Sequence, residues 1–301
     1  MTLVLAALLS APPGSSAVEA RIAEKIRAFH GTMGVYARNL DTGEEIAVGA
    51  DTRFPTASLI KVAVMADVFR QIQAGKLRKD QVVVLQDTEK AGDETVPLNM
   101  LHGGTPLTVS DLLRFMIAYS DNTATNLLIG LVGTASVDAL LDTLGLPKTR
   151  LYRPTFRDGK ADVLPEEEKE FGLGSTTPRE AGRLLALIAE GKVVSRAACD
   201  AMIAILADQQ DRAMIPRSLP FERDEILVAN KTGWDAEKLP DAKGFRGDAR
   251  NDAGYVKGPK ARYVIAICAR RIRDKSASVD NEALRTGGEI SRIVYDHFQS
   301  R

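Results

Sequence analysis

The hydrophobic periodicity of this chain changes twice, and these changes limit the folds that it can adopt. Near the N-terminus, Met33–Leu40 and Glu45–Val48 show β-type patterns and are joined by the turn sequence DTGE. A turn that contains Asp and Gly between two such runs predicts a β-hairpin. The last third of the chain returns to β-rich runs at Ile226–Ala229, Ala253–Val256 and Tyr263–Ala269. A sheet in this protein must therefore combine strands from both ends of the chain.

Helical periodicity dominates the middle of the chain and also occurs close to both termini. The predicted helices span Val18–His30, Leu59–Gln73, Val109–Ala118, Asn122–Val132, Val137–Leu144, Pro178–Ala189, Ser195–Leu206 and Glu282–Phe298. We predict an α/β fold of the α+β type, in which an antiparallel sheet is flanked by terminal helices. The α/β domain is expected to be discontinuous, with residues 18–52 and 208–301, and an all-helical domain of residues 53–207 is inserted in it. Because clefts between domains are favoured ligand sites, we expect the active site between these two.

The composition excludes several classes of protein. Forty Lys and Arg residues balance 40 Asp and Glu residues, so the formal net charge is zero. A nucleic-acid partner is therefore not expected, since such proteins normally carry a basic excess. The three histidines are isolated and lack metal-ligand spacing, so no metal site is predicted. Cys199 and Cys268 lie in apolar runs typical of free cysteines, with a disulfide as the alternative. We expect a monomer.

The N-terminal residues 1–17 are interpreted as a signal peptide. Thr2–Ala11 is a short apolar run, and Ser15 and Ala17 suit the −3 and −1 positions of a cleavage site. The run is too short to span a bilayer, and no other segment reaches that length, so no stable membrane span is expected. No basic residue precedes Arg21, which departs from an ordinary signal and leaves a simple apolar tail as the alternative. The prediction is export to the periplasm or the medium.

The first chemical motif lies at the start of a predicted helix, where Ser58 is followed by Lys61. A serine and a lysine three residues apart share one helical face, so the amine can approach the hydroxyl. A lysine of lowered pKa can then take the proton of the serine and activate it as a nucleophile. The pattern S-x-x-K alone occurs about once by chance in a chain of this length. Its alternative interpretation is a capping serine beside a solvated lysine.

Two further motifs follow in order. Ser120-Asp121-Asn122 stands between two predicted helices, where a capping cluster is the alternative interpretation. Lys231-Thr232-Gly233 ends a β-rich run, where an ordinary turn glycine is the alternative. Three motifs in this order, each at the junction of predicted elements, are much less frequent by chance than any one of them. Together they form a strong signal for one site.

With these motifs the chain resembles the penicillin-recognising serine hydrolases, and most closely the class A β-lactamases. The resemblance covers about residues 18–300. It extends to several segments that flank the motifs, namely Arg53-Phe54-Pro55, Leu107-Thr108-Val109, Asn122 to Leu128 and Thr176-Thr177-Pro178. It implies the β-lactamase/transpeptidase fold and hydrolysis of β-lactam amides through an acyl-serine intermediate, with antibiotic resistance or β-lactam catabolism as the biological role. No cofactor is implied.

The resemblance also implies a role for each matching residue. Ser58 corresponds to the acylated nucleophile, Lys61 to its proton acceptor, and Ser120 to a relay that passes a proton to the leaving nitrogen. Lys231 and Thr232 correspond to the groups that bind the substrate carboxylate, with Lys231 counted among the catalytic residues. Substrate binding further involves Asn122, Gly233 and Trp234, with the backbone N–H groups of Ser58 and Trp234 forming an oxyanion hole. Two lysines in one cleft are expected to lower each other's pKa.

Three departures from the family pattern bear on turnover. Arg153 matches the arginine that anchors the omega loop, but Thr155 stands where the family has a catalytic glutamate. The acidic residues that follow, including the run 166–170, are interpreted as a solvated face, with a loop that carries one carboxylate inward as the alternative. Trp234 replaces the usual small residue. The loop from 234 to 252 holds Arg246 and Arg250, either of which is a candidate for the family's additional carboxylate-binding arginine.

These features leave three hypotheses. The first is a class A-type β-lactamase acting on a small-molecule β-lactam. The second is a D,D-peptidase or esterase on the same scaffold, acting on acyl-peptides or small esters. The third is a penicillin-binding sensor that is acylated without turnover. The order and spacing of the motifs favour the first, whereas Thr155 favours the other two.

Overall fold

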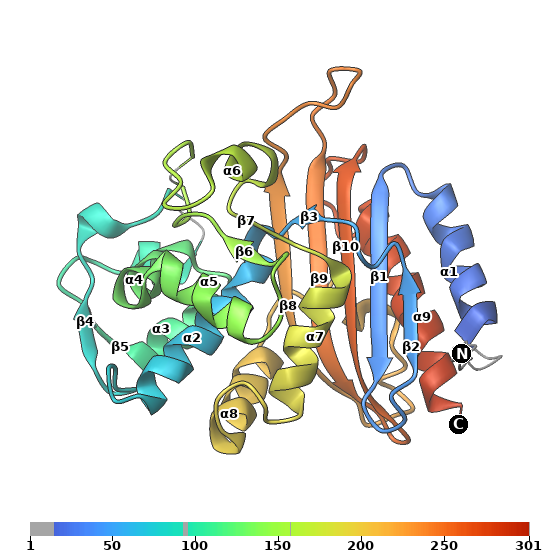
Figure 1. Cartoon of the computed structure of the whole chain (residues 1–301), viewed down its shortest axis with the longest axis horizontal. Coiled ribbons are helices and arrows are strands. Elements are labelled where there is room, and N and C mark those ends of the chain that lie inside the picture. The colour runs from blue at the N-terminus through green and yellow to red at the C-terminus, as the bar shows by residue number, and fades with distance from the viewer. Residues whose placement is uncertain (1–14, 93–95, 157, 301) are drawn as a thin grey trace, which may run out of the picture.

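In the computed structural model of the protein, described for residues 15–92, 96–156 and 158–300, strands from both ends of the chain form one antiparallel sheet (Figure 1). Its strand order is β2-β1-β10-β9-β8. The strands are β1 (Thr32–Asn39), β2 (Glu45–Val48), β8 (Leu227–Ala236), β9 (Asp248–Lys257) and β10 (Arg262–Ile272). The predicted hairpin is confirmed, with Val35 opposite Val48 and Arg38 opposite Glu45. Strand β1 then pairs with β10, which joins the N-terminal hairpin to the C-terminal strands.

The sheet separates two hydrophobic cores because side chains alternate between its faces. Along β10, Tyr263, Ile265 and Ile267 pack on the core that contains helix α1 (Ser15–Ala28) and helix α9 (Glu282–Gln299). Val264 and Ala266 pack on the opposite core, which contains helical residues from the middle of the chain, between positions 59 and 206. Figure 1 shows α1 and α9 together on one side of the sheet and the other helices on the far side. The predicted α+β class is confirmed.

The helical part follows the predicted pattern closely. Its helices are α2 (Lys61–Gln73), α3 (Val109–Ala118), α4 (Asn122–Val132), α5 (Thr134–Thr143), α7 (Pro178–Ala189) and α8 (Arg196–Ala207). Gly75, the expected stop after α2, has a φ of +72° that favours glycine. The prediction of one helix from Leu59 was wrong at its start, since Ala57–Ile60 forms a 3₁₀ turn and α2 begins at Lys61.

Several short elements were not predicted. Strands β3 (Phe54–Pro55), β6 (Arg150–Leu151) and β7 (Gly174–Thr176) form a small sheet of order β3-β7-β6, and β4 (Val82–Val84) pairs with β5 (Pro106–Thr108). Helix α6 (Pro165–Phe171) contains the acidic run. The other short turns are 3₁₀ helices at Asp87–Glu89, Pro97–Met100 and Pro216–Ser218. Runs of two to four residues are too short to show a hydrophobic period.

Two predictions about the termini and domains stay untested. Residues 1–14 of the predicted signal segment 1–17 lie outside the described residues, and 15–17 form the first turn of α1. The division into residues 18–52 plus 208–301 and residues 53–207 stays a prediction. Within the described part of the chain, no single helix has the length and apolar character needed to cross a membrane; α4 and α5 meet those criteria only as a pair, bent by 77°.

Candidate active site

Ser58 lies in the 3₁₀ turn between β3 and α2, at the edge of the main sheet. The preceding residue, Ala57, has a φ of +44°, in the left-handed region that side-chain-bearing residues rarely adopt. Such strain persists only where neighbouring structure fixes the backbone. Ser58 itself is half-buried, while Ala57 and Leu59 are buried. The strained turn thus leaves Ser58 partly exposed to solvent, whereas the residues on either side of it are buried.

Two strands of the main sheet hold this turn in place. Asn251 of β9 donates from Nδ2 to the carbonyl oxygens of Pro55 and Thr56, at 2.8 and 3.0 Å. Gly233 of β8 lies opposite Asn251 and packs directly on the same backbone. A Cβ at Gly233 would stand 2.6 Å from the Thr56 oxygen and 3.1 Å from the Ser58 nitrogen. The fit therefore requires glycine at position 233.

The three motifs converge on the hydroxyl of Ser120. Lys61 donates from Nζ to the Ser120 carbonyl oxygen at 2.7 Å, to Ser120 Oγ at 3.2 Å and to Asn122 Oδ1 at 2.8 Å. Lys231 donates to the same Oγ at 3.0 Å and to the Thr232 carbonyl oxygen at 2.8 Å. Both lysine residues are fully buried. Ser120 has a φ of +57°, so a second strained residue stands at this site.

Asp121, the middle residue of the second motif, has a structural role. Its carboxylate caps α4 by accepting from the Ala124 backbone N–H at 2.8 Å, and it also accepts from the Leu98 N–H at 2.8 Å. The capping interpretation of the motif therefore holds for Asp121. Its neighbours Ser120 and Asn122 instead accept hydrogen bonds from Lys61.

Burial sets the charge state of Lys231. Removal from water disfavours the ammonium form and lowers the pKa of Lys231 to about 8, against the opposing influence of Asp211 and Asp252. The sequence led us to attribute a lowered pKa to the second lysine, whereas the cause that lowers the pKa of Lys231 is burial. Lys231 is thus a cation at neutral pH whose charge is lost in mildly alkaline solution.

The third motif lies inside a strand and not at its end. Strand β8 continues three residues beyond Gly233, because it stays paired with β9 as far as Ala236 and Asp248. The predicted loop from 234 to 252 is correspondingly shorter, and Arg250 lies within β9, directly opposite Trp234. The Arg250 guanidinium covers the Trp234 ring at 4.7 Å from its centroid. Trp234 remains 57% exposed, as expected for a half-exposed strand aromatic.

A pocket of about 150 Å³ opens beside Ser58. Its lining includes Ser58, Asn122, Thr155, Phe156, Trp234 and Asp235. Thr155 is fixed to α4, since its backbone N–H and its Oγ1 donate to Asn126 Oδ1 at 2.8 and 2.9 Å, and Asn126 Nδ2 donates back to the Thr155 oxygen at 3.2 Å. The loop residue at the family's glutamate position therefore lines the pocket without a carboxylate, and its hydroxyl is bonded to Asn126.

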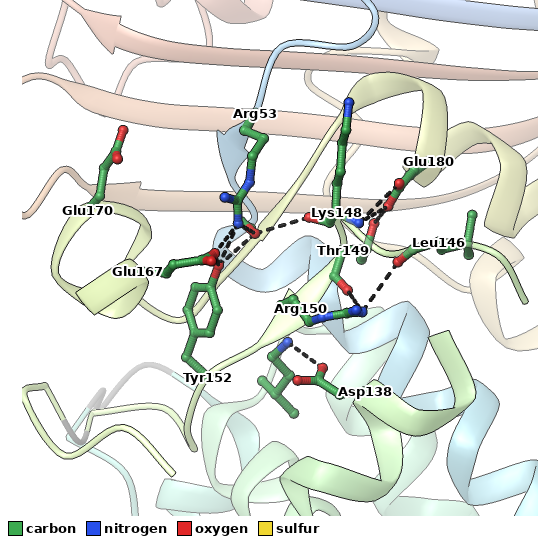
Figure 2. Close-up of polar contacts among 12 residues, drawn as sticks. Arg53, Asp138, Leu146, Lys148, Thr149, Arg150, Tyr152, Glu167, Glu170 and Glu180 are labelled. Carbon is green, nitrogen blue, oxygen red and sulfur yellow. Dashed lines mark hydrogen bonds and ion pairs between the residues drawn. The ribbon is translucent and has the colours of Figure 1, made fainter. Parts of the chain in front are cut away.

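Ion pairs anchor the loop that follows. The fully buried Arg153 pairs with Glu168 at 2.8 Å and with Asp158. Figure 2 shows Glu167 directed toward Arg53 and Tyr152, and the Tyr152 hydroxyl donates to Glu167 at 2.8 Å. The interpretation of the acidic run as a solvated face is therefore wrong for Glu168, which is only 4% exposed. The buried arginine needs a buried acidic partner.

Several residues of the site could not be identified from the sequence: Asn126, Asp235, Asn251 and Asp252. Asn126 lies in the matching segment Asn122 to Leu128 but was given no role there, and the other three lie outside the three motifs. An alternating strand pattern extended past Gly233 would have placed Asp235 on the same face as Lys231. Cys199 and Cys268 are buried and free. Across the described ranges, no group of three or more His, Cys, Asp or Glu side chains is arranged to hold a metal ion.

Asp252 lies fully buried behind the third motif and makes stability depend on pH. It accepts from Asn230 Nδ2 at 2.8 Å and from the Ile215 N–H at 2.9 Å, yet burial raises its pKa to about 7. A raised folded pKa contributes stability that is present below about pH 4 and lost as pH rises through 7. For Asp252→Asn, we expect the free energy of unfolding relative to the parent to increase between pH 4 and 7.5. Urea titrations at several pH values measure this, and a difference that does not change with pH would contradict it.

Comparison with known proteins finds similarity along most of the chain. A family model described as the β-lactamase enzyme family matches residues 17–298. The β-lactamase of Streptomyces albus G is 35% identical over 88% of this chain and 81% of its own length. β-Lactamase L2 of Stenotrophomonas maltophilia is 30% identical over 76% of this chain and 70% of its own length.

Solved structures show the same similarity. A β-lactamase from Sphaerobacter thermophilus superposes with a TM-score of 0.76 and 28% identity, over 93% of this chain and 97% of that one. A variant of PBP-A in an acyl-enzyme complex with penicillin G superposes with a TM-score of 0.78 and 25% identity, over 96% of this chain and all of that one.

Proposed function

The chain belongs to the β-lactamase enzyme family, and on that premise we propose that it is a serine hydrolase that opens β-lactam amides through an acyl-serine intermediate. The supporting observation is the position of Ser120 Oγ, which lies 3.2 Å from Lys61 Nζ and 3.0 Å from Lys231 Nζ. Lys61 also donates to Asn122, which lines one pocket with Ser58. A hydroxyl between two amines provides a path for protons in both directions.

Acylation then proceeds in four steps. Ser58 Oγ attacks the carbonyl carbon of the lactam while Lys61 accepts the proton of the hydroxyl. The backbone N–H groups of Ser58 and Trp234 bind the oxyanion that forms. Ser120 gives its proton to the leaving nitrogen as the carbon–nitrogen bond breaks, and it regains a proton from Lys61. The product of this half-reaction is an ester between the opened lactam and Ser58.

The substrate is oriented by side-chain groups of the site that can still form hydrogen bonds with it. Asn122 uses its Oδ1 to accept from Lys61, so its Nδ2 can donate to the carbonyl of the substrate's amide side chain. Lys231 and Thr232 bind the carboxylate, and Gly233 lets β8 approach the Ser58 turn. Arg250 is engaged with Trp234 and with the Ser276 carbonyl oxygen, at 2.7 Å. Trp234 lines the pocket, and its ring is held in place by the contact with Arg250.

Intact-mass spectrometry of the protein mixed with penicillin G, followed over time, tests this function. A transient adduct on Ser58 followed by return of the free mass and accumulation of opened penicillin is the expected result. An adduct that persists would instead support the penicillin-binding sensor. Absence of an adduct, together with hydrolysis of D-alanyl peptides or small esters, would support the peptidase or esterase hypothesis and overturn the proposal.

The pKa of Lys231 predicts how activity depends on pH. From pH 7 to 9 the protonated fraction of a group with a pKa of about 8 falls from about nine-tenths to about one-tenth. We expect kcat/KM for penicillin G to fall up to about tenfold over this range, beyond any change for penicillin G methyl ester. The ester lacks the carboxylate that Lys231 binds, so it serves as the control substrate. Equal decreases for the two substrates would contradict the assignment.

The setting of the enzyme is also part of the proposal. The N-terminal apolar run supports export, with residues 1–17 as a signal segment. The two-part arrangement proposed from the sequence places Ser58 near the junction of residues 18–52 plus 208–301 with residues 53–207. A monomer suffices for the chemistry, because Ser58, Lys61, Ser120 and Lys231 all come from one chain.

A further inference from the structure

The strand that contains the third motif carries one more polar side chain toward the pocket. Side chains alternate along β8, so Lys231, Gly233 and Asp235 share a face. Lys231 reaches Ser120 on that face, and the position of a Cβ at Gly233 points at the Ser58 turn. Two residues of a strand span about 7 Å. Asp235 is therefore one step further along this face of the strand than Gly233, and it lines the same pocket as Ser58.

Asp235 differs from the other acids near the pocket in lacking a cationic partner. It lines the pocket together with Ser58, Asn122 and Thr155. No Lys, Arg or His nitrogen among the described residues lies within the 4 Å of an ion pair with it. Lys238, three residues further on, instead donates to Asp158 at 2.8 Å. The carboxyl of Asp235 is thus available to a water molecule or a substrate.

The acids of the loop after Thr155 are engaged elsewhere. Asp158 is held between Arg153 and Lys238, and Glu168 is also paired with Arg153. Figure 2 shows Glu167 turned toward Arg53 and Tyr152, and the Tyr152 hydroxyl donates to it. The remaining acids contact residues outside the pocket: Asp162 contacts Thr134, Glu166 contacts Lys169, and Glu170 contacts Arg270. The described part of the loop therefore provides no unpaired carboxylate at the family's glutamate position.

We propose that Asp235 accepts the proton from the water molecule that hydrolyses the acyl-enzyme, in place of a loop glutamate. This inference rests on the proposed β-lactam hydrolysis. The water oxygen bonds to the ester carbonyl carbon while one water proton passes to the Asp235 carboxylate. The bond between that carbon and Ser58 Oγ then breaks, and the serine oxygen takes up the proton. The acid product leaves, and both Ser58 and Asp235 return to their starting states.

The electrostatic surroundings suit a general base. Burial raises the pKa of Asp235 above its usual value, and the negative charge of Asp158 acts in the same direction. Lys238, Arg153 and the Ala236 backbone N–H act in the opposite direction and do not cancel the effect of burial. A carboxylate with a pKa closer to the working pH is a stronger base than an exposed one.

The test compares Asp235→Asn with the parent protein in single-turnover reactions with penicillin G, followed by intact-mass spectrometry. We expect acylation within about threefold of the parent and a half-life of the adduct at least about 100-fold longer, the usual contribution of a general base. Hydroxylamine, a nucleophile that needs little help from a base, should release the adduct from the variant. The matched control is Glu166→Gln, because Glu166 is exposed and contacts only Lys169 among its described ion pairs.

The pH dependence gives a second measurement. Deacylation by the parent should slow as acid protonates Asp235, and this acid limb should be absent from the residual deacylation by Asp235→Asn. Parent-like deacylation by the variant, or trapping of the adduct by Asp158→Asn instead, would overturn the inference. A persistent adduct on the parent would also overturn it, while leaving acylation of Ser58 intact. No adduct on the parent would refute the proposed function itself.

Discussion

Replacement of Ser58 by alanine is expected to abolish both adduct formation and turnover of penicillin G, with a loss of at least about 10⁴-fold in kcat/KM. The loss is large because every later step requires the ester on Ser58 Oγ. Ser120 stays in contact with Lys61 and Lys231 in such a variant, since Ser58 takes no part in these two hydrogen bonds. Half-buried Ser58 also contributes little packing, so the melting temperature should change by only a few degrees.

The matched control for this prediction is Ser300→Ala. Ser300 is exposed after α9, and its hydroxyl donates only to the His297 carbonyl oxygen among its described hydrogen bonds. This control should form the penicillin adduct at the rate of the parent. Intact-mass spectrometry under single-turnover conditions measures adduct formation in both variants. An adduct on the Ser58→Ala protein would mean that another residue is the nucleophile, and the proposed mechanism would then be wrong.

Most of the regular fold could be predicted from the sequence, because its elements are long enough to show their period. Helices α3, α4 and α7 begin and end at the predicted residues. Strand β8 could not be predicted to its end, since Trp234 to Ala236 continue it only through pairing with β9. The 3₁₀ turn at Ser58 was missed because packing from the sheet, and not local helix propensity, decides its conformation.

The candidate site shows the same division between local pattern and distant contact. The motifs identified Ser58, Lys61, Ser120 and Lys231 because their spacing is visible along the chain. Asn251 could not be found in this way, since its significance lies in donating to carbonyl oxygens almost 200 positions earlier. Asp235 was likewise hidden, because only the paired strand defines which way its side chain points. Sequence motifs therefore suggested the residues for acylation, whereas the three-dimensional structure was needed to suggest a residue for deacylation.

Gly233→Ala is expected to lower kcat/KM for penicillin G by about 100-fold or more, although it adds a single methyl group. The new Cβ would stand 2.6 Å from the Thr56 oxygen, 2.8 Å from the Leu59 nitrogen and 3.1 Å from the Ser58 nitrogen. All three are backbone atoms, so no side chain can rotate to relieve the contact. Strand β8 must move away from the Ser58 turn, which separates the two N–H groups of the oxyanion hole. A displacement of about 1 Å is enough for a loss of this size.

A control substitution at a second glycine, Gly130, distinguishes this steric effect from a general effect of adding a methyl group. Gly130 lies in α4, and a Cβ at this position would have no described atom within 4 Å, so alanine there should stabilise the helix by about 0.5–1 kcal/mol. Gly130→Ala should therefore retain the activity of the parent, whereas overpacking in Gly233→Ala should cost about 1–3 kcal/mol of stability. Steady-state kinetics and urea unfolding measure both effects. Parent-like kcat/KM in Gly233→Ala would show that β8 and the Ser58 turn can separate without harm, and the oxyanion hole would then have to lie elsewhere.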